Sequence, residues 1–264
     1  MKNRLLKRLE FGLRRRWARL KARDPQLRAQ LKSYNDFFFN ELGVSRELAV
    51  TRLREIMERA GIEPTEQRDS IHLLAFAAVE VSGFCPANVL EFGTGYGYST
   101  SFLAELFPQA RVYTVELPPE DPGYARRIHP IGQAKYEQIL EERLARPNIV
   151  PIRANTVWML KQTLPDFDLI WLDASHRYPA VAWDHFYCMN KLAPGGWLFT
   201  DDMRPPENPH ARWNPHCLDI YELVNYFNAR QEDKFRFLLK RENPIDFLVD
   251  PKYVGFLQKS SSGN

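Results

Sequence analysis

The feature that most constrains this chain is a glycine-rich turn at residues 89–100, VLEFGTGYGYST. Three glycines alternate directly after an apolar run: Gly93, Gly95 and Gly97. A strand that passes through glycines into a helix lets the backbone approach a bound ligand closely, as in nucleotide-binding α/β proteins. The turn therefore predicts an α/β fold with a cofactor at the carboxyl end of this strand.

Short runs rich in β-branched and aromatic residues recur along the chain. Seven of them are expected to be strands: residues 88–93, 111–117, 148–154, 167–173, 195–202, 235–240 and 252–258. Helical segments separate the first five, which is typical of a doubly wound, mostly parallel sheet. No helix is expected between the last two strands, so they are predicted to form an antiparallel pair at one edge. Two helices, at residues 45–64 and 65–83, are expected before the glycine turn.

The first 23 residues differ in charge from the rest of the chain. They hold ten Lys or Arg and one acid, Glu10, so their net charge is +9; the whole chain carries +3, which leaves −6 on the remainder. Five apolar residues recur here at helical spacing: Leu5, Leu9, Leu13, Trp17 and Leu20. Such a basic amphipathic helix suits an anionic membrane surface or an acidic partner. A solvated helix that packs its leucines against the body is an equal alternative.

These patterns divide the chain into three parts. We expect helices over residues 1–64, a cofactor-binding domain over 65–259 and a disordered tail over 260–264. No apolar run approaches the roughly 18 residues of a membrane span, and the three cysteines are widely spaced. Both features favour a reduced, cytoplasmic protein, with a peripheral position at the inner face of the membrane as the alternative. Assembly into a homo-oligomer is left open.

The residues around the turn discriminate between cofactors. A dinucleotide fingerprint has a third glycine where Tyr98 stands, and a phosphate-binding loop has a Lys followed by Ser or Thr, which these glycines lack. Glu91, before the turn, can take an ammonium group, and Ser99 and Thr100 open a helix whose N–H groups favour a carboxylate. Glu116, at the end of the next strand, can accept hydrogen bonds from two ribose hydroxyls. A zwitterion joined to adenosine is therefore favoured.

On these motifs, residues 65–258 resemble the class I S-adenosylmethionine-dependent methyltransferases. LEFGTGYGYST is similar to their first motif, Glu116 falls at their ribose-binding acid, and IRANTVWML is similar to the stretch that contacts adenine. Where that stretch often has Asp, this chain has Asn155, whose side-chain carbonyl can still reach the adenine amino group. The resemblance implies S-adenosylmethionine as cofactor, bound by Glu91, Gly93, Thr94, Gly95, Tyr96, Gly97, Ser99, Glu116, Asn155, Thr156 and Asp173.

Carboxylates end two further strands. Asp173 ends one, and Asp201 and Asp202 end the next. Carboxylates on one rim repel one another unless a cation lies between them. Oxygen ligands without Cys or His at zinc spacing favour Mg²⁺ or Mn²⁺, or else Ca²⁺. The pattern resembles the metal-dependent O-methyltransferases of the catechol type and of the macrolide- and aminocoumarin-sugar type. The alternative is that Asp201 or Asp202 caps a turn.

His176 follows Asp173 by three residues, where the catechol-type enzymes carry a lysine base. A histidine there titrates near neutral pH and can take a hydroxyl proton. His176 and Asp173 are therefore the predicted catalytic residues of methyl transfer to a hydroxyl of a small molecule or sugar, and residues 118–138 and 204–217 are candidate walls of the acceptor pocket. Two alternatives stay open: a tRNA or rRNA methyltransferase docked by its basic N-terminus, and a non-catalytic S-adenosylmethionine-binding assembly protein.

Overall fold

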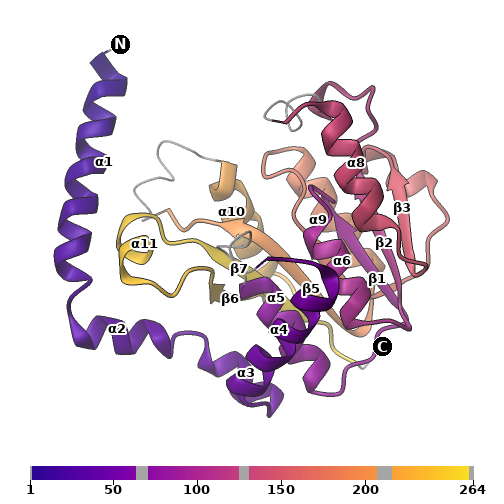
Figure 1. Ribbon diagram of the computed structural model, residues 1–264, viewed down its shortest axis with the longest axis horizontal. Coiled ribbons are helices and arrows are strands. Elements are labelled where there is room, and N and C mark those ends of the chain that lie inside the picture. Colours follow the sequence, from indigo (N-terminus) through magenta and orange to yellow (C-terminus); the bar gives the residue numbers. More distant parts are fainter. Residues whose placement is uncertain (1, 64–70, 125–130, 207–215, 262–264) are drawn as a thin grey trace.

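A computed structural model describes residues 2–63, 71–124, 131–206 and 216–261 of the chain. Its centre is a seven-stranded sheet in the order β3-β2-β1-β4-β5-β7-β6 (Figure 1). The strands are β1 (Asn88–Phe92), β2 (Arg111–Glu116), β3 (Ile149–Arg153), β4 (Phe167–Leu172), β5 (Leu192–Met203), β6 (Arg236–Leu239) and β7 (Tyr253–Gln258). The helices are α1 (Lys2–Lys21), α2 (Pro25–Lys32), α3 (Asp36–Leu42), α4 (Arg46–Ala60), α5 (Ile71–Val81), α6 (Tyr98–Leu106), α8 (Gln133–Leu144), the 3₁₀ helix η1 (Thr156–Lys161), α9 (Ala180–Lys191), α10 (His216–Asn228) and α11 (Pro244–Val249).

The strand pairing follows the expected plan. Neighbours from β3 to β5 are parallel, and β7 runs antiparallel to both β5 and β6. The predicted doubly wound sheet with an antiparallel pair at one edge is therefore confirmed. The expectation that no helix separates the last two strands is wrong, because α11 lies between them. Asn243 begins this short helix by accepting a hydrogen bond from the Asp246 amide (2.8 Å), and Pro244 occupies its first position.

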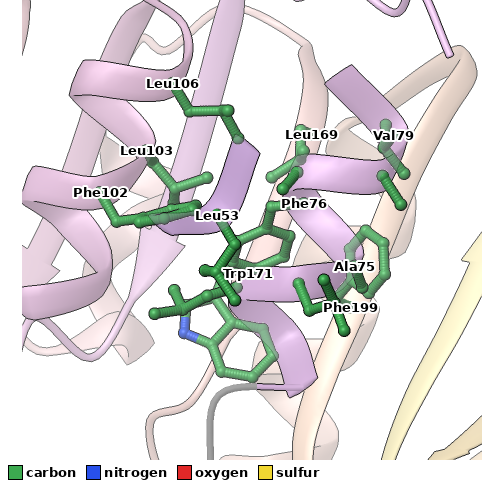
Figure 2. Close-up of a cluster of buried hydrophobic side chains, with 14 of the residues drawn as sticks. Leu53, Ala75, Phe76, Val79, Phe102, Leu103, Leu106, Leu169, Trp171 and Phe199 are labelled. Carbon is green, nitrogen blue, oxygen red and sulfur yellow. The ribbon is translucent and has the colours of Figure 1, made fainter. Parts of the chain in front are cut away.

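Both faces of the sheet are covered, because successive side chains on a strand point in opposite directions. Val89 belongs to a core that α4, α5 and α6 cover, and its neighbour Leu90 belongs to a core that α9 and α10 cover. Figure 2 shows the first core, where Leu53, Phe76 and Trp171 converge from α4, α5 and β4. Burial on both faces explains why these strands read as continuous apolar runs.

The two helices expected before the glycine turn are present with shorter bounds. Ser45 caps α4 by accepting from the Leu48 amide (3.1 Å), and α4 ends at Gly61, whose φ is +68°. The start of the second predicted helix lies outside the described residues, and α5 ends at Val81. Because β1, β2 and β4 run parallel, their carboxyl ends point to one rim of the sheet. The helices α4 and α5 cover one face of the same sheet.

The predicted domain boundary at residue 64 does not divide the hydrophobic core. Phe38 of α3 is buried, and its ring packs edge-on against Phe256 of β7 (centroid distance 4.9 Å) and Trp197 of β5 (6.0 Å). Of the helices that precede residue 64, α1 and α2 stand at the margin of the sheet domain, and α1 packs along α11 (Figure 1). In the tail predicted to be disordered, the Ser260 amide hydrogen bonds Asp233, and residues 262–264 lie outside the described range.

Candidate functional site

A cavity of about 300 Å³ opens at the carboxyl ends of β1, β2, β3 and β4. Its lining comes from these strand ends and from the segments that follow them: Gly93, Val115, Glu116, Leu117, Ala154, Asn155, Thr156, Ala174, Ser175 and Ala180. Open α/β sheets bind their ligands at this rim. Four predicted cofactor residues therefore share one cavity, namely Gly93, Glu116, Asn155 and Thr156.

The glycine turn forms one wall of this cavity. Gly93 has φ +97°, and a Cβ there would lie 2.1 Å from the carbonyl oxygen of Asp173, so no larger residue fits between β1 and the end of β4. Gly95 has φ +55°, and a Cβ there would meet no atom within 4 Å. The Gly95 amide donates to one carboxylate oxygen of Glu116 (2.9 Å), and the Leu117 amide donates to the other (2.9 Å). Bare backbone and a fixed acid thus suit the methionyl and ribose parts of S-adenosylmethionine.

Glu91 lies beneath the turn rather than in the cavity. Its carboxylate is fully buried and accepts hydrogen bonds from the hydroxyls of Ser99, Thr100 and Thr114. Burial raises the pKa of Glu91 to about 7, although the three hydroxyls act in the opposite direction. Thr94 joins the same cluster through the Thr114 hydroxyl (2.7 Å). Glu91, Ser99 and Thr94 therefore hold β1, β2 and α6 together, and a direct contact of Glu91 with the cofactor ammonium stays a prediction.

Tyr96 and Gly97 lie on the outer side of the turn. The Tyr96 ring packs edge-on against Tyr136 of α8 (5.4 Å), whose hydroxyl donates to the carbonyl oxygen of Gly95 (2.5 Å). Gly97 has φ +75° and begins α6, where a Cβ would come within 3.2 Å of Arg143. Neither residue lines the cavity, so both support the turn from behind.

Asn155 begins η1 at the far wall of the cavity. Its side-chain oxygen accepts from the Val157 amide (3.1 Å), and its amide group donates to Asp121 (3.0 Å). The neighbouring Thr156 is held by its carbonyl oxygen, which accepts from the Trp183 indole of α9 (3.1 Å). The oxygen expected to reach adenine is therefore already oriented by the helix that it caps.

Sequence reasoning missed Asp184, which is buried below this wall. Burial raises the pKa of Asp184 to about 6, and the Thr156 hydroxyl and the Ser175 amide partly oppose this rise. Both of those residues line the cavity. The available signal was a lone acid inside the apolar stretch AVAWDHFYC, since a buried carboxylate is rare without a partner.

His176 and Asp173 are brought together beside the cavity. The His176 Nε2 lies 3.2 Å from the Asp173 Oδ1, and the two residues between them, Ala174 and Ser175, line the cavity. Burial lowers the pKa of His176 below its ordinary value of 6.5; Asp202 and Asp201 favour the proton, whereas Lys240 and Lys252 disfavour it. The imidazole is consequently neutral at pH 7 and able to accept a proton.

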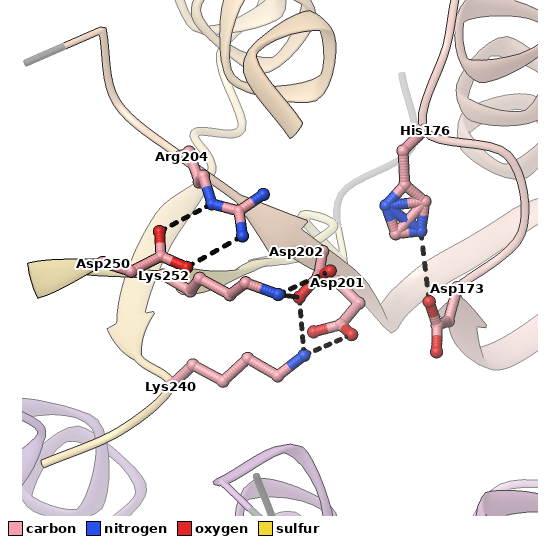
Figure 3. A network of polar contacts seen from close by, with 8 residues as sticks. All are labelled: Asp173, His176, Asp201, Asp202, Arg204, Lys240, Asp250 and Lys252. Atoms are coloured by element: carbon pink, nitrogen blue, oxygen red, sulfur yellow. Dashed lines mark hydrogen bonds and ion pairs between the residues drawn. The ribbon is translucent and has the colours of Figure 1, made fainter. Parts of the chain in front are cut away.

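The carboxylates of Asp201 and Asp202 do not face an open cation site. Figure 3 shows that Lys240 reaches both, at 2.6 and 2.8 Å, and that Lys252 reaches Asp202 at 2.9 Å. Asp173 lies apart from them, toward His176 (Figure 3). Within residues 2–63, 71–124, 131–206 and 216–261, no three His, Cys, Asp or Glu side chains form a group that can hold a metal. The sequence predicted a divalent cation as the compensating charge; in the structure two lysines that follow much later in the chain lie against Asp201 and Asp202.

The predicted acceptor pocket is described in part. Residues 125–130 of the insertion and 207–215 of the proline-rich loop lie outside the described residues. The described start of that loop is fixed by Arg204, whose guanidinium forms two hydrogen bonds to Asp250, at 2.8 and 2.9 Å. In the part of the chain that the structure describes, no helix combines the length and apolar character needed to cross a membrane.

Comparison with known proteins agrees with this geometry. A family model for a methyltransferase domain matches residues 90–203, from the glycine turn to the end of β5. No curated protein sequence matches the chain. Among solved structures, the O-methyltransferase TomG from Streptomyces achromogenes, in complex with S-adenosylmethionine, is 15% identical with a TM-score of 0.51, covering 80% of this chain and 89% of that one. The O-methyltransferase from Bacillus cereus, in complex with S-adenosylhomocysteine, is 18% identical with a TM-score of 0.50, covering 79% and 91%.

At these identities the two solved structures establish the fold, and the family match extends over the strands that form the cavity. Residues 90–203 therefore match a methyltransferase domain, and the sheet that contains them has the fold of these two S-adenosylmethionine-dependent enzymes.

Proposed function

We propose that this methyltransferase transfers the methyl group to a hydroxyl oxygen of a small molecule or sugar. The observation that carries the proposal is the His176–Asp173 pair (3.2 Å) at the edge of the cavity. Methylation of a hydroxyl requires that its proton be removed, and a neutral histidine is suited to this task near pH 7. The two solved structures compared above are both O-methyltransferases, which supports the same acceptor atom.

The residues of the chain divide the work between alignment and proton transfer. When bound, S-adenosylmethionine supplies an electrophilic methyl group on a sulfonium, and displacement by oxygen needs the two reactants in line. Glu116 lines the cavity, and the Gly95 amide fixes its carboxylate (2.9 Å) so that it can hold the cofactor. If Nε2–H of His176 donates to Asp173, Nδ1 is the nitrogen that takes the proton. The metal-assisted form of this reaction, expected from the sequence, is not part of the proposal because Lys240 and Lys252 already neutralise Asp201 and Asp202.

We also propose that α1 docks on an anionic membrane surface. Leu13, Trp17 and Leu20 are 66%, 50% and 67% exposed at spacings that align them on one face. Ala18 and Ala22, which point elsewhere, are buried. Basic residues flank the exposed stripe, and Glu10 is the only acid of the first 23 residues. An apolar stripe with cationic margins suits the boundary between headgroups and acyl chains.

The first experiment measures cofactor binding by calorimetry with S-adenosylhomocysteine. The wild-type chain should bind it, and Gly95→Val should lose binding, because a branched side chain at φ +55° both strains the turn and projects beside the Glu116 wall. Gly61→Val is the matched control: Gly61 has φ +68° and equally open surroundings, but it ends α4 away from the cavity. Tight binding of NAD without S-adenosylhomocysteine would contradict the assignment.

The second experiment screens acceptors with radiolabelled S-adenosylmethionine. Phenols and sugars should be methylated at oxygen. Transfer to tRNA alone would favour the nucleic-acid alternative, in which the basic N-terminus binds RNA. Binding of S-adenosylhomocysteine without transfer to any acceptor would favour the non-catalytic alternative.

A further inference from the structure

Two lysines occupy the acid pair at the end of β5. The Lys240 Nζ lies 2.6 Å from Asp201 Oδ2 and 2.8 Å from Asp202 Oδ1. The Lys252 Nζ lies 2.9 Å from both oxygens of Asp202. The side chains of Lys240 and Asp201 are each 7% exposed, so this ion pair is protected from solvent. We call these four residues the β5 ion cluster.

The pairing of β6 with β7 positions the two lysines of the β5 ion cluster. Lys240 follows β6 and Lys252 precedes β7, and the Lys240 amide donates to the carbonyl oxygen of Lys252 (2.8 Å), which continues the pairing of the two strands. Both ammonium groups are thereby directed at β5, which lies beside β7. Asp202 is the one residue other than glycine, in the described part of the chain, with φ in the left-handed region (56°). Such strain persists where surrounding interactions maintain it.

Charge within the cluster is balanced. The two carboxylates face two ammonium groups, and the neighbouring Arg204–Asp250 pair adds one charge of each sign. Burial disfavours the charge on Lys240, but Asp201 and Asp202 outweigh it and raise the pKa of Lys240. Burial also disfavours the charge on Asp202, but Lys240 and Lys252 outweigh it and lower the pKa of Asp202. Lys240 and Asp202 therefore stay ionised across the neutral range.

A divalent cation does not fit among these groups. Mg²⁺ binds carboxylate oxygens at about 2.0–2.1 Å and needs an octahedral shell of oxygens. Here three of the four carboxylate oxygens already accept hydrogen bonds from the two ammonium groups, and the fourth, Asp201 Oδ1, is buried without a hydrogen-bond partner among the described residues. A metal added at that single oxygen would lie within a few ångströms of both ammonium groups, where like charges repel strongly in a buried setting. We propose that Lys240 and Lys252 take the place of a divalent metal at the β5 rim, so that this methyltransferase works with a built-in cation pair and needs no added metal. The inference rests on the proposed function.

The test is Mn²⁺ binding, measured by electron paramagnetic resonance on the full-length chain, because it does not require the acceptor. Wild type should show no site that depends on Asp202. The double variant Lys240→Ala/Lys252→Ala removes both ammonium groups and leaves the carboxylates, so it should bind one Mn²⁺ about tenfold or more tightly than wild type. Adding Asp202→Asn should abolish the gain. The matched control, Lys191→Ala/Lys259→Ala, removes the same charge from lysines that contact Asp166 and the Leu192 carbonyl instead, and should gain no site.

Two further measurements test the proposal even if the double variant does not fold. If the double variant does not fold, Lys252→Ala alone removes the more exposed lysine, and wild type itself still discriminates. Wild type that binds Mn²⁺ with submillimolar affinity, and loses it in Asp202→Asn, would overturn the proposal, as would methyl transfer that stops in EDTA and returns with Mg²⁺. S-adenosylhomocysteine binding, followed separately, distinguishes a failure of this proposal from a failure of the proposed function. If the wild-type chain does not bind S-adenosylhomocysteine but the Mn²⁺ results are as expected, only the proposed function is refuted.

Discussion

At the scale of single residues, His176 is governed by opposing influences. Burial favours its neutral form, and the charges of the β5 ion cluster act on it in pairs of opposite sign. A balanced cluster changes the proton affinity of a neighbouring group less than its carboxylates alone would. His176 therefore differs from a histidine beside uncompensated acids, which would hold its proton more strongly and be a poorer base at neutral pH.

This balance gives a prediction for pH. Because the pKa of His176 is lowered from 6.5, the base form should be present at neutral pH, and the rate should fall only as the pH drops through that lowered pKa. His176→Ala should reduce kcat by roughly 10² to 10⁴, the range of a general base. An NMR titration of the ring protons gives the pKa directly, and His72→Gln, which alters a buried imidazole stacked on Trp171 (4.7 Å), should leave the titration midpoint of His176 unchanged. A midpoint above 6.5, or full activity of His176→Ala, would contradict the assigned base.

Sequence alone could predict residues whose role depends on strand order, but not those whose role depends on later partners. Glu116 and Gly93 reach one cavity because parallel strands end at the same rim. The state of Asp201 and Asp202 depends on Lys240 and Lys252, which reach them only through the pairing of β7 with β5 and β6. No local pattern around the acids contains that information.

At the scale of elements, α1 presents two different surfaces. Ala18 and Ala22 are buried, while Leu13, Trp17 and Leu20 stay exposed, and α1 packs along α11. The alternative in which the helix packs its leucines against the body does not hold for Leu13 and Leu20, because Ala18 and Ala22 are the residues that are buried. What docks on the open side stays a prediction. Exposed apolar side chains aligned between basic residues favour a lipid surface as the occupant of the open side.

The prediction for α1 uses a triple variant, Leu13→Ser/Trp17→Ser/Leu20→Ser. It should sediment with phosphatidylserine-containing vesicles much less than wild type, because it loses the apolar stripe and keeps the basic charge. The control triple, Leu48→Ser/Trp158→Ser/Leu160→Ser, removes the same residue types at similar exposures of 53%, 55% and 64%, and should bind as wild type does. Equal loss in both triples, or binding to neutral vesicles as strong as to anionic ones, would refute the docking surface. Retention on an acidic protein with no affinity for vesicles would favour the partner alternative.

Whether a helix or strand can be predicted from the sequence depends on the number of residues in it. The strands and the helices α4 to α6 were expected because each has several periods of a repeating pattern. α11 has six residues, fewer than two helical turns, so its periodicity gives no signal. Its starting residues, Asn243 and Pro244, were the available evidence, since an Asn cap followed by Pro is a helix-start pattern.

At the scale of the whole molecule, charge and packing divide the chain at different positions. The change of charge falls near residue 23, but the hydrophobic core already includes α3 and α4. Asn35 marks the beginning of the packed body. It is fully buried, and its side chain pairs with the backbone of Leu239 at the end of β6, accepting from the amide (2.8 Å) and donating to the carbonyl (3.0 Å).

Two truncations should therefore behave differently. Deleting residues 1–23 removes Ala18 and Ala22 as its buried residues among those whose side chains are described, so unfolding should stay cooperative and the melting temperature should change little. Deleting residues 1–63 also removes six large buried side chains from the core: Phe38, Phe39, Leu53, Ile56, Met57 and Ile62. At about 1.5–3 kcal/mol each, their burial approaches the roughly 5–15 kcal/mol that stabilises a whole domain.

The longer truncation should consequently lose its cooperative transition, because the sheet face under α4 would lie open to water. Thermal and urea unfolding followed by circular dichroism measure this, and S-adenosylhomocysteine affinity reports on the cavity at the carboxyl ends of the strands. The shorter truncation should retain that affinity, since the cavity is lined by Gly93 and later residues. A fragment beginning at residue 64 that melts cooperatively near the wild-type temperature would mean that α3 and α4 form an appendage after all. In that case the boundary expected from the sequence would be correct.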